Sequence, residues 1–331
     1  MSPDANARQI GASGIRASAI GLGTWAIGGW MWGGTEESES IAAIQASIDA
    51  GITLIDTAPA YGQGLAEELV GRAIKGRRDK VVLATKCGLV WHTTKGHHFF
   101  DYDGKPVHRY LGRDAIFYEV EQSLRRLGTD HIDHYITHWQ DPTTPIAETM
   151  DALVELKQQG KIGSIGASNV SEADLKAYIA TDALDAIQEE YSMARRGIES
   201  TLLPLCRENN VSVLSYSSLS RGLLTGKVGA DREFSGDDQR RTDPHFSLGN
   251  REKVGRLMAD IAPIAAAHGA TPSQVVIAWT IRQPGITFAL CGARNVSQAR
   301  ENAGAAEIDL SPDEITTISE AVTRQLVQLA A

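Results

Sequence analysis

The sequence predicts an α/β protein built as one (β/α)8 TIM barrel over residues 1–331. Short runs rich in Ile, Val and Leu alternate with longer segments of helical period, an alternation typical of βαβ units in a parallel sheet. Eight apolar runs are present, which is the number that closes this kind of barrel. No linker, low-complexity tract or longer repeat divides the chain, and its length is usual for a single barrel domain.

A small hairpin over Arg8–Ala17 is the first predicted element, and it would plug the barrel floor. The barrel strands are predicted at Ala19–Gly23, Thr53–Thr57, Val81–Lys86, Ile132–His138, Ser164–Ala167, Ala186–Glu189, Ser212–Tyr216 and Thr287–Cys291. The helices between them are predicted at Ser38–Ala50, Ala66–Ile74, Arg113–Leu127, Pro145–Gln159, Ser171–Ile179 and Ile198–Asn209. Extra helices toward the C-terminus are predicted at about Arg251–His268 and Pro272–Arg282.

Two segments are too long to be simple connections. The polar stretch Arg221–Gly249 is expected to be a functional loop. The loop Leu89–Gly112 follows the third strand, so we expect it to form a wall or lid of a substrate pocket. It holds several histidines, but their spacing matches no ligand set on a helix or strand, and no metal site is predicted.

The composition is that of an ordinary globular protein, with 42% hydrophobic and 22% charged residues. A net charge of −9 argues against a nucleic acid or an anionic membrane as partner. No apolar run is long enough to span a membrane, and the N-terminus does not resemble a signal peptide. The odd number of widely spaced cysteines (Cys87, Cys206, Cys291) suits reduced thiols in a cytoplasm.

Polar or aromatic residues stand at the expected carboxyl end of every strand, where a barrel builds its active site. The second, third and fourth strands provide Asp56 with Tyr61 just beyond it, then Lys86, then His138. The remaining ends carry Gly23-Thr24-Trp25, Ser168-Asn169, Gln188, Tyr216, and Gly292 with Arg294. Any one of these residues could be structural, but so many polar groups around one rim predict a site.

The chemistry of four of them suits reduction of a carbonyl group. Tyr61 could donate the proton if its pKa were lowered toward the working pH, which a neighbouring Lys86 ammonium would favour. Asp56 would hold that ammonium in place, and His138 would orient the substrate oxygen. A doubly wound sheet is the competing architecture, because Gly21–Ala26 loosely matches a dinucleotide fingerprint; no helix opens at these glycines, so a Rossmann site is not favoured.

Several segments then resemble one known family, the aldo-keto reductase superfamily, in order from about Gly21 to Arg324. They read IDTAPAYGQGLAEELVGRAI, ATKCG, YITHWQDPTTPIAETM, GKIGSIGASNVS and YSSLSRGLLTGK. The resemblance is nearest to bacterial members that act on sugar and short polyol aldehydes. It implies a barrel that binds NADP(H) without a Rossmann domain and a catalytic tetrad of Asp56, Tyr61, Lys86 and His138. Ser217 and Cys291 depart from the family, which usually has proline at these two positions.

The resemblance also implies the cofactor contacts. Tyr216 would stack on the nicotinamide, the segment Leu219–Lys227 would cover the pyrophosphate, and Arg294, beside a helix start near Ser297, would bind the 2′-phosphate. That arginine favours NADP over NAD. The full predicted set is Gly23, Thr24, Trp25, Ser168, Asn169, Gln188, Tyr216, Ser217, Leu219, Arg221, Gly222, Lys227, Gly292, Arg294, Gln298 and Asn302.

The expected substrate walls are tryptophans at the barrel mouth, namely Trp25, Trp32, Trp91 and Trp139, with Trp30 beside them. The favoured function is an NADPH-dependent reductase of aldehydes or ketones, reversible as an alcohol dehydrogenase. A Schiff-base lyase that uses Lys86 as its nucleophile and a cofactor-binding regulatory barrel remain as alternatives. The substrate, the direction of reaction and the oligomeric state stay open at this point.

Overall fold

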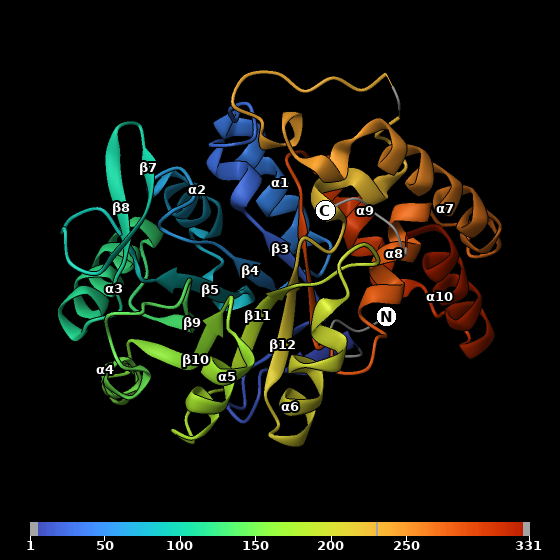
Figure 1. Ribbon diagram of the computed structural model, residues 1–331. Helices are drawn as coiled ribbons and strands as arrows, with labels where there is room; N and C mark the ends of the chain where they lie inside the picture. Colours follow the sequence, from blue (N-terminus) through green and yellow to red (C-terminus); the bar gives the residue numbers. More distant parts are fainter. Residues whose placement is uncertain (1–5, 230, 327–331) are drawn as a thin grey trace.

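The structure is a computed structural model that describes residues 6–229 and 231–326. Within these ranges eight parallel strands close into a barrel, which confirms the predicted (β/α)8 fold (Figure 1). Around the barrel the order is β10-β11-β12-β13-β3-β4-β5-β9. The strands are β3 (Ile20–Gly23), β4 (Leu54–Asp56), β5 (Val82–Cys87), β9 (Ile132–Thr137), β10 (Ile162–Ser168), β11 (Ala186–Glu190), β12 (Ser212–Tyr216) and β13 (Phe288–Gly292).

Helices cover the outside of the barrel. They are α1 (Glu37–Asp49), α2 (Leu65–Ile74), α3 (Arg113–Leu127), α4 (Ile146–Gln158), α5 (Glu172–Ile179), α6 (Leu202–Glu208), α7 (Leu248–Ala267), α8 (Pro272–Thr280), α9 (Val296–Gly304) and α10 (Pro312–Leu326). The single helix expected over Ile198–Asn209 is wrong, because a 3-10 turn at Gly197–Ser200 is separated from α6 by a non-helical Thr201 (φ −120°, ψ −74°).

Helix ends follow local chemistry. Ser171 and Asp174 form a reciprocal capping box at the start of α5, and Thr271 and Gln274 form another at the start of α8. Gly128 ends α3 in the left-handed conformation (φ 64°), where its N–H bonds to carbonyls of the last turn. These caps satisfy backbone groups that the helices themselves leave unpaired.

The barrel interior is filled by apolar side chains that alternate with outward-facing ones along each strand. The inner cluster comprises Ile10, Ala17, Leu54, Ala84, Ile136, Ala186, Leu214, Phe288 and Leu290. Ile10 and Ala17 belong to the N-terminal hairpin β1 (Ala7–Gln9) and β2 (Arg16–Ser18), so the predicted plug is confirmed. Gly11 touches the barrel so closely that an added Cβ would lie 2.2 Å from the Asp185 carbonyl oxygen.

The segment after β5, predicted to be a loop, contains a small sheet instead. Residues 89–109 form an antiparallel sheet of β6 (Leu89–Val90), β8 (Lys105–Arg109) and β7 (His97–Tyr102). The turn between β7 and β8 contains Asp103 and Gly104, both with positive φ (49° and 71°). Asp-Gly is a strong hairpin signal, but it was not used in the prediction. In Figure 1 this hairpin projects beyond the strands at the edge of the barrel.

The polar segment after β12 crosses the top of the barrel toward the loop that precedes α1 (Figure 1). The Asp237 carboxylate accepts hydrogen bonds from the backbone N–H groups of Met31 (2.8 Å) and Gly33 (2.9 Å). The Arg240 guanidinium lies 4.9 Å from the centre of the Trp32 ring. We call residues 231–247 the strap, because this segment joins two distant parts of the barrel mouth.

None of the helices in residues 6–229 and 231–326 combines the length and the apolar character needed to cross a lipid bilayer.

We expect Ile10→Ala to lower the free energy of unfolding by about 2–5 kcal/mol, because it removes a fully buried side chain from the plug and leaves a cavity. Urea denaturation followed by circular dichroism measures the change. Leu248→Ala is the control, since this leucine is 55% exposed. An Ile10→Ala protein as stable as the control would contradict the role of the hairpin as a packed plug.

Candidate active site

A buried ion pair lies at the carboxyl ends of β4 and β5. The Lys86 ammonium is fully buried and contacts both carboxylate oxygens of Asp56, at 2.8 and 2.9 Å. It also donates to the Thr57 carbonyl oxygen at 2.9 Å and lies 3.2 Å from the Tyr61 hydroxyl. The structure thus brings together three of the four residues of the predicted tetrad within hydrogen-bond distance.

The strand register explains why these groups meet. Asp56 is paired with Ala84, so Lys86 lies two residues farther along the neighbouring strand on the same inward face. Gln188 of β11 adds a hydrogen bond from its amide nitrogen to Asp56 (2.8 Å). A buried charge is tolerated only when its hydrogen-bonding capacity is met, and here every contact serves that requirement.

Tyr61 lies in the turn after β4, with its ring between two other candidate residues. The ring stacks near Trp25 (centroids 6.3 Å apart) and meets the His138 ring edge-on at 5.7 Å. Gly28, in the segment before α1, lies against the backbone of Tyr61: a Cβ added to Gly28 would lie 2.6 Å from the Tyr61 carbonyl carbon. Only glycine allows this approach, which holds Tyr61 against the ion pair.

Burial raises the pKa of Tyr61, and the nearby Lys86 ammonium opposes that rise only in part. The expectation of a lowered pKa is therefore wrong, although the effect of Lys86 has the predicted sign. Desolvation outweighs it because the ring is partly buried between Trp25 and His138. A phenol that keeps its proton is suited to donate it.

Lys86 keeps its charge. Burial alone would lower the pKa of Lys86, but the Asp56 carboxylate and the Tyr61 hydroxyl raise it above the ordinary value. A lysine that forms a Schiff base must be a neutral amine, which requires a lowered pKa. The contacts of Lys86 therefore argue against the lyase alternative.

His138 follows β9 and has a half-buried ring. Desolvation and the Lys86 ammonium hold the pKa of His138 well below its usual value, so the ring is neutral at physiological pH. Among the described residues its imidazole forms no hydrogen bond, while its backbone N–H donates to the Cys87 carbonyl (2.8 Å). One ring N–H is thus left to donate to another molecule.

The predicted nicotinamide side is a connected network. Tyr216 donates its hydroxyl proton to the Asn169 side-chain oxygen (2.7 Å). The Asn169 amide nitrogen donates to the His138 carbonyl (2.9 Å) and to the Ser168 hydroxyl (3.1 Å). Ser168 in turn donates to the Gln188 carbonyl (2.7 Å), so these predicted contact residues form one platform beside the tetrad.

The predicted pyrophosphate segment has unusual backbone geometry. Ser217, Ser220 and Arg221 have φ of 54°, 46° and 55°, and Gly222 follows with 93°. Left-handed residues next to right-handed ones form concavities lined by N–H groups that suit an anion. Proline cannot adopt a positive φ, so the backbone of this chain requires a residue other than proline at position 217.

The two cations of this segment are engaged within the protein. Arg221 forms an ion pair with Asp243 of the strap and donates to Gln239 (3.2 Å). Lys227 pairs with Glu301 of α9 at 2.7 Å. These contacts tie the segment and the strap together and place Lys227 toward α9. Leu219 and Gly222 lie within the same turn.

The predicted adenosine side lies at the start of α9. Asn295 caps this helix through the Gln298 N–H (3.0 Å), so α9 begins before the expected start near Ser297. Asn302 donates to the Gly292 carbonyl (3.0 Å). Arg294 donates to the carbonyls of Trp32 (3.2 Å) and Gly34 (2.6 Å), so it joins the start of α9 to the loop before α1.

These residues fit a nicotinamide dinucleotide. The hydroxyl of Thr24, just after β3, is buried and has no hydrogen-bond partner among the described residues, as expected of a group that meets a ligand. Gly23 and Gly292 are paired across β3 and β13 at the same rim, where neither residue adds a side chain. No group of three His, Cys, Asp or Glu residues able to hold a metal ion occurs in the described part of the chain.

The tryptophans are only partly brought together. Trp25 and Trp32 form an edge-on pair (5.6 Å) beside Tyr61. Trp139 contacts Phe99 of β7 (5.2 Å), and Trp30 stacks on Phe100 (5.3 Å), so the hairpin supplies part of the aromatic wall. Trp91 makes no ring contact with these residues in the part of the chain that the structure describes.

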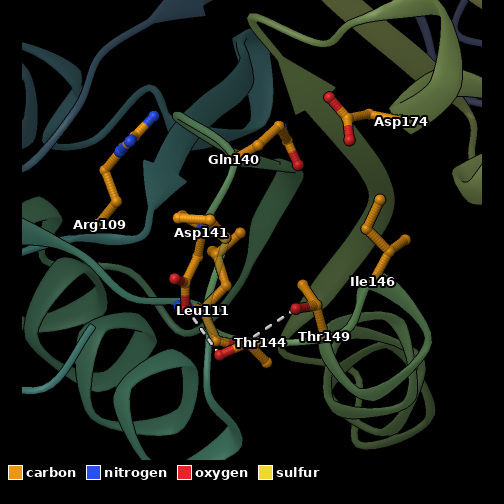
Figure 2. Close-up of a pocket in the computed structure, with 9 residues that line it drawn as sticks. Arg109, Leu111, Gln140, Asp141, Thr144, Ile146, Thr149 and Asp174 are labelled. Atoms are coloured by element: carbon orange, nitrogen blue, oxygen red, sulfur yellow. Dashed lines mark hydrogen bonds between the residues drawn. The ribbon is translucent and has the colours of Figure 1, made fainter. Parts of the chain in front are cut away.

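A pocket of about 220 Å³ lies beside the segment that follows β9 (Figure 2). It is lined by Arg109, Leu111, Gln140, Asp141, Pro142, Thr144, Ile146, Thr149 and Asp174, and by none of the tetrad. Gln140 links the pocket lining to the platform, because its amide nitrogen donates to the Ser168 carbonyl (3.0 Å). Gln140 was not predicted as a site residue, although it stands two residues after His138 at the same strand end.

Comparisons with known proteins agree with this geometry. Residues 19–323 match the aldo/keto reductase family. Over 292 residues the chain is 45% identical to the Bacillus subtilis aldo-keto reductase YhdN, covering 87% of this chain and 85% of that one. Over 317 residues it is 40% identical to an Escherichia coli NADH-specific methylglyoxal reductase, covering 94% and 96%.

Solved structures are similar as well. The Gluconobacter oxydans glycerol dehydrogenase AKR11B4 superposes with a TM-score of 0.88 at 36% identity, covering 100% of this chain and 98% of that one. A Klebsiella pneumoniae aldo/keto reductase in complex with NADP and acetate superposes with a TM-score of 0.70 at 33% identity, covering 94% and 93%.

The His138 imidazole is expected to stay neutral as the pH falls through about 6.5, the ordinary value for histidine, because desolvation lowers its pKa well below that value in the folded protein. NMR titration of the histidine rings measures this, with the His138 signal assigned by its absence in His138→Asn. A midpoint near the ordinary value of about 6.5 would contradict the desolvated position described above.

Proposed function

This chain belongs to the aldo/keto reductase family, and we propose that it reduces aldehydes and ketones to alcohols with NADPH as the hydride donor. The observation that carries the proposal is the contact of Tyr61 with the buried Lys86–Asp56 pair. NAD(P)-dependent carbonyl reduction is the activity of the family. The preference for NADPH, the substrate and the roles of individual residues are our own assignments.

We assign the proton transfer to Tyr61. When bound, the reduced cofactor supplies a hydride to the carbonyl carbon, and the oxygen must then receive a proton. Tyr61 keeps its proton because its pKa is raised, and the Lys86 ammonium 3.2 Å away stabilises the phenolate that remains. His138 donates its ring N–H to the substrate oxygen and directs that oxygen toward Tyr61.

We assign the cofactor to the rim formed by the platform, the left-handed segment and α9. Tyr216 would carry the nicotinamide ring, with Ser168, Asn169 and Gln188 near its carboxamide. Arg294, beside the start of α9, would meet the 2′-phosphate, which favours NADP(H). The NADP complex of the Klebsiella reductase supports this choice, whereas the NADH-specific Escherichia coli relative makes NAD(H) the alternative.

We propose short polyol or sugar aldehydes as substrates. The mouth combines an aromatic wall around Trp25 with a polar base at Tyr61 and His138, which suits a small hydroxylated carbonyl compound. The similarity to a methylglyoxal reductase and to a glycerol dehydrogenase supports small oxygenated substrates.

The three cysteines are buried free thiols, in keeping with a cytoplasmic site of action.

Tyr61→Phe is expected to reduce the rate of carbonyl reduction by about 10²- to 10⁴-fold, because it removes the proton donor but keeps the ring. NADPH oxidation at 340 nm with short aldehydes measures the rate. Quenching of tryptophan fluorescence by NADPH should stay unchanged in the variant. Wild-type turnover by Tyr61→Phe would remove Tyr61 from the mechanism, and a wild-type protein that binds NADPH without turnover would favour a regulatory barrel.

Arg294→Gln is expected to weaken NADPH binding by about ten- to a hundredfold through loss of a charge-assisted contact. The variant also breaks the bonds of Arg294 to Trp32 and Gly34, which would weaken both cofactors alike. Dissociation constants for NADPH and NADH, measured in parallel by fluorescence, separate the two effects. An equal loss for both cofactors would contradict the assignment of the 2′-phosphate to Arg294.

A further inference from the structure

We propose that Glu189 is a positioning residue that holds the turn at Asn169 and, through Asn169, the orientation of the Tyr216 ring. Glu189 belongs neither to the tetrad nor to the predicted cofactor contacts. Because the nicotinamide is assigned to Tyr216, the effect on cofactor binding rests on the proposed function, whereas the effect on the ring itself does not.

Glu189 is an acidic side chain that is buried away from any cation in the described residues. Its neighbour Gln188 points inward to Asp56, so Glu189 faces the opposite side of β11, where it is 6% exposed. No Lys, Arg or His in the described residues pairs with it. Burial raises the pKa of Glu189 to about 8, against the effect of hydrogen bonds from the backbone N–H groups of Val170 and Asn169. Such burial is expected only where the group makes a specific contact.

That contact is with the turn that ends β10. A side-chain oxygen of Glu189 accepts a hydrogen bond from the Val170 N–H at 2.9 Å. The residue before it, Asn169, has φ of 58°, in the left-handed region that few residues other than glycine and asparagine adopt. Glu189 fixes the N–H that follows this left-handed residue from the next strand.

The Asn169 side chain passes this constraint to the platform. Its amide nitrogen bonds to the His138 carbonyl and the Ser168 hydroxyl, and its oxygen accepts from the Tyr216 hydroxyl. A change in the backbone at Asn169 would therefore move the partner of the Tyr216 hydroxyl. Among the described residues, the bond to Asn169 is the one hydrogen bond that the Tyr216 hydroxyl makes.

A second buried acidic side chain supplies a control. Asp185, just before β11, is 4% exposed, accepts a hydrogen bond from the Ile165 N–H of β10 at 2.9 Å and also pairs with Lys157 at 3.2 Å. Asp185 thus joins the same two strands where their pairing begins, away from the platform. If Glu189 only fastens β11 to β10, loss of either carboxylate should have similar consequences.

The test compares Glu189→Ala, Glu189→Gln and Asp185→Ala in the full chain. Glu189→Ala should raise the dissociation constant for NADPH about tenfold, and Glu189→Gln, which keeps an acceptor oxygen, should restore it to within about threefold. Asp185→Ala should lower stability to urea with NADPH binding within about twofold of wild type. In a double-mutant cycle, Glu189→Ala should add no further loss to Asn169→Ala, because it acts through that residue.

The environment of the Tyr216 ring is measured independently by the NMR chemical shifts of labelled tyrosines in the cofactor-free protein. Its signals should shift in Glu189→Ala and stay in place in Asp185→Ala. Unshifted signals, or effects of Glu189→Ala and Asn169→Ala that simply multiply, would overturn the inference. If Glu189→Ala does not fold, Tyr216→Phe replaces it, and a wild-type affinity for NADPH would then be the contrary result. A wild-type protein that binds neither NADPH nor NADH would instead refute the proposed function.

Discussion

The buried contact between Lys86 and Asp56 is the interaction on which the remaining features of the site depend. A fully buried ammonium is stable only with close acceptors, and the end of β4 supplies three of them at 2.8–2.9 Å. Desolvation raises the pKa of Tyr61 and lowers the pKa of His138; the fixed charge of Lys86 opposes the first shift and adds to the second. One ion pair thereby acts on both groups that we assign to the substrate oxygen.

The rest of the mouth is organised by side chains that cross from strand to strand. Gln188 joins β11 to Asp56, and Asn169 joins β10 to His138 and Tyr216. These links make the strand ends a rigid base, while the hairpin β7–β8 and the strap close over it from two sides. This division agrees with barrels in general, where strands hold the reacting groups and loops provide the walls.

The strands and the tetrad could be predicted because alternating apolar residues mark each strand and polar residues at strand ends conflict with a core. Properties that depend on enclosure could not be read in this way: the raised pKa of Tyr61 reflects desolvation in the folded protein. Glu189 was missed because an outward-facing acid near a strand end resembles a surface residue. The hairpin at Asp103-Gly104 was missed although its signal was present, and the break at Thr201 had no clear signal.

The most direct test of this account is a crystal structure of the protein grown with NADP⁺. The account requires the Tyr61 oxygen to lie within hydrogen-bond distance of the Lys86 nitrogen and to face an open space beside a nicotinamide ring that rests on Tyr216. A phenol turned away from Lys86, or a nicotinamide bound elsewhere on the barrel, would contradict it.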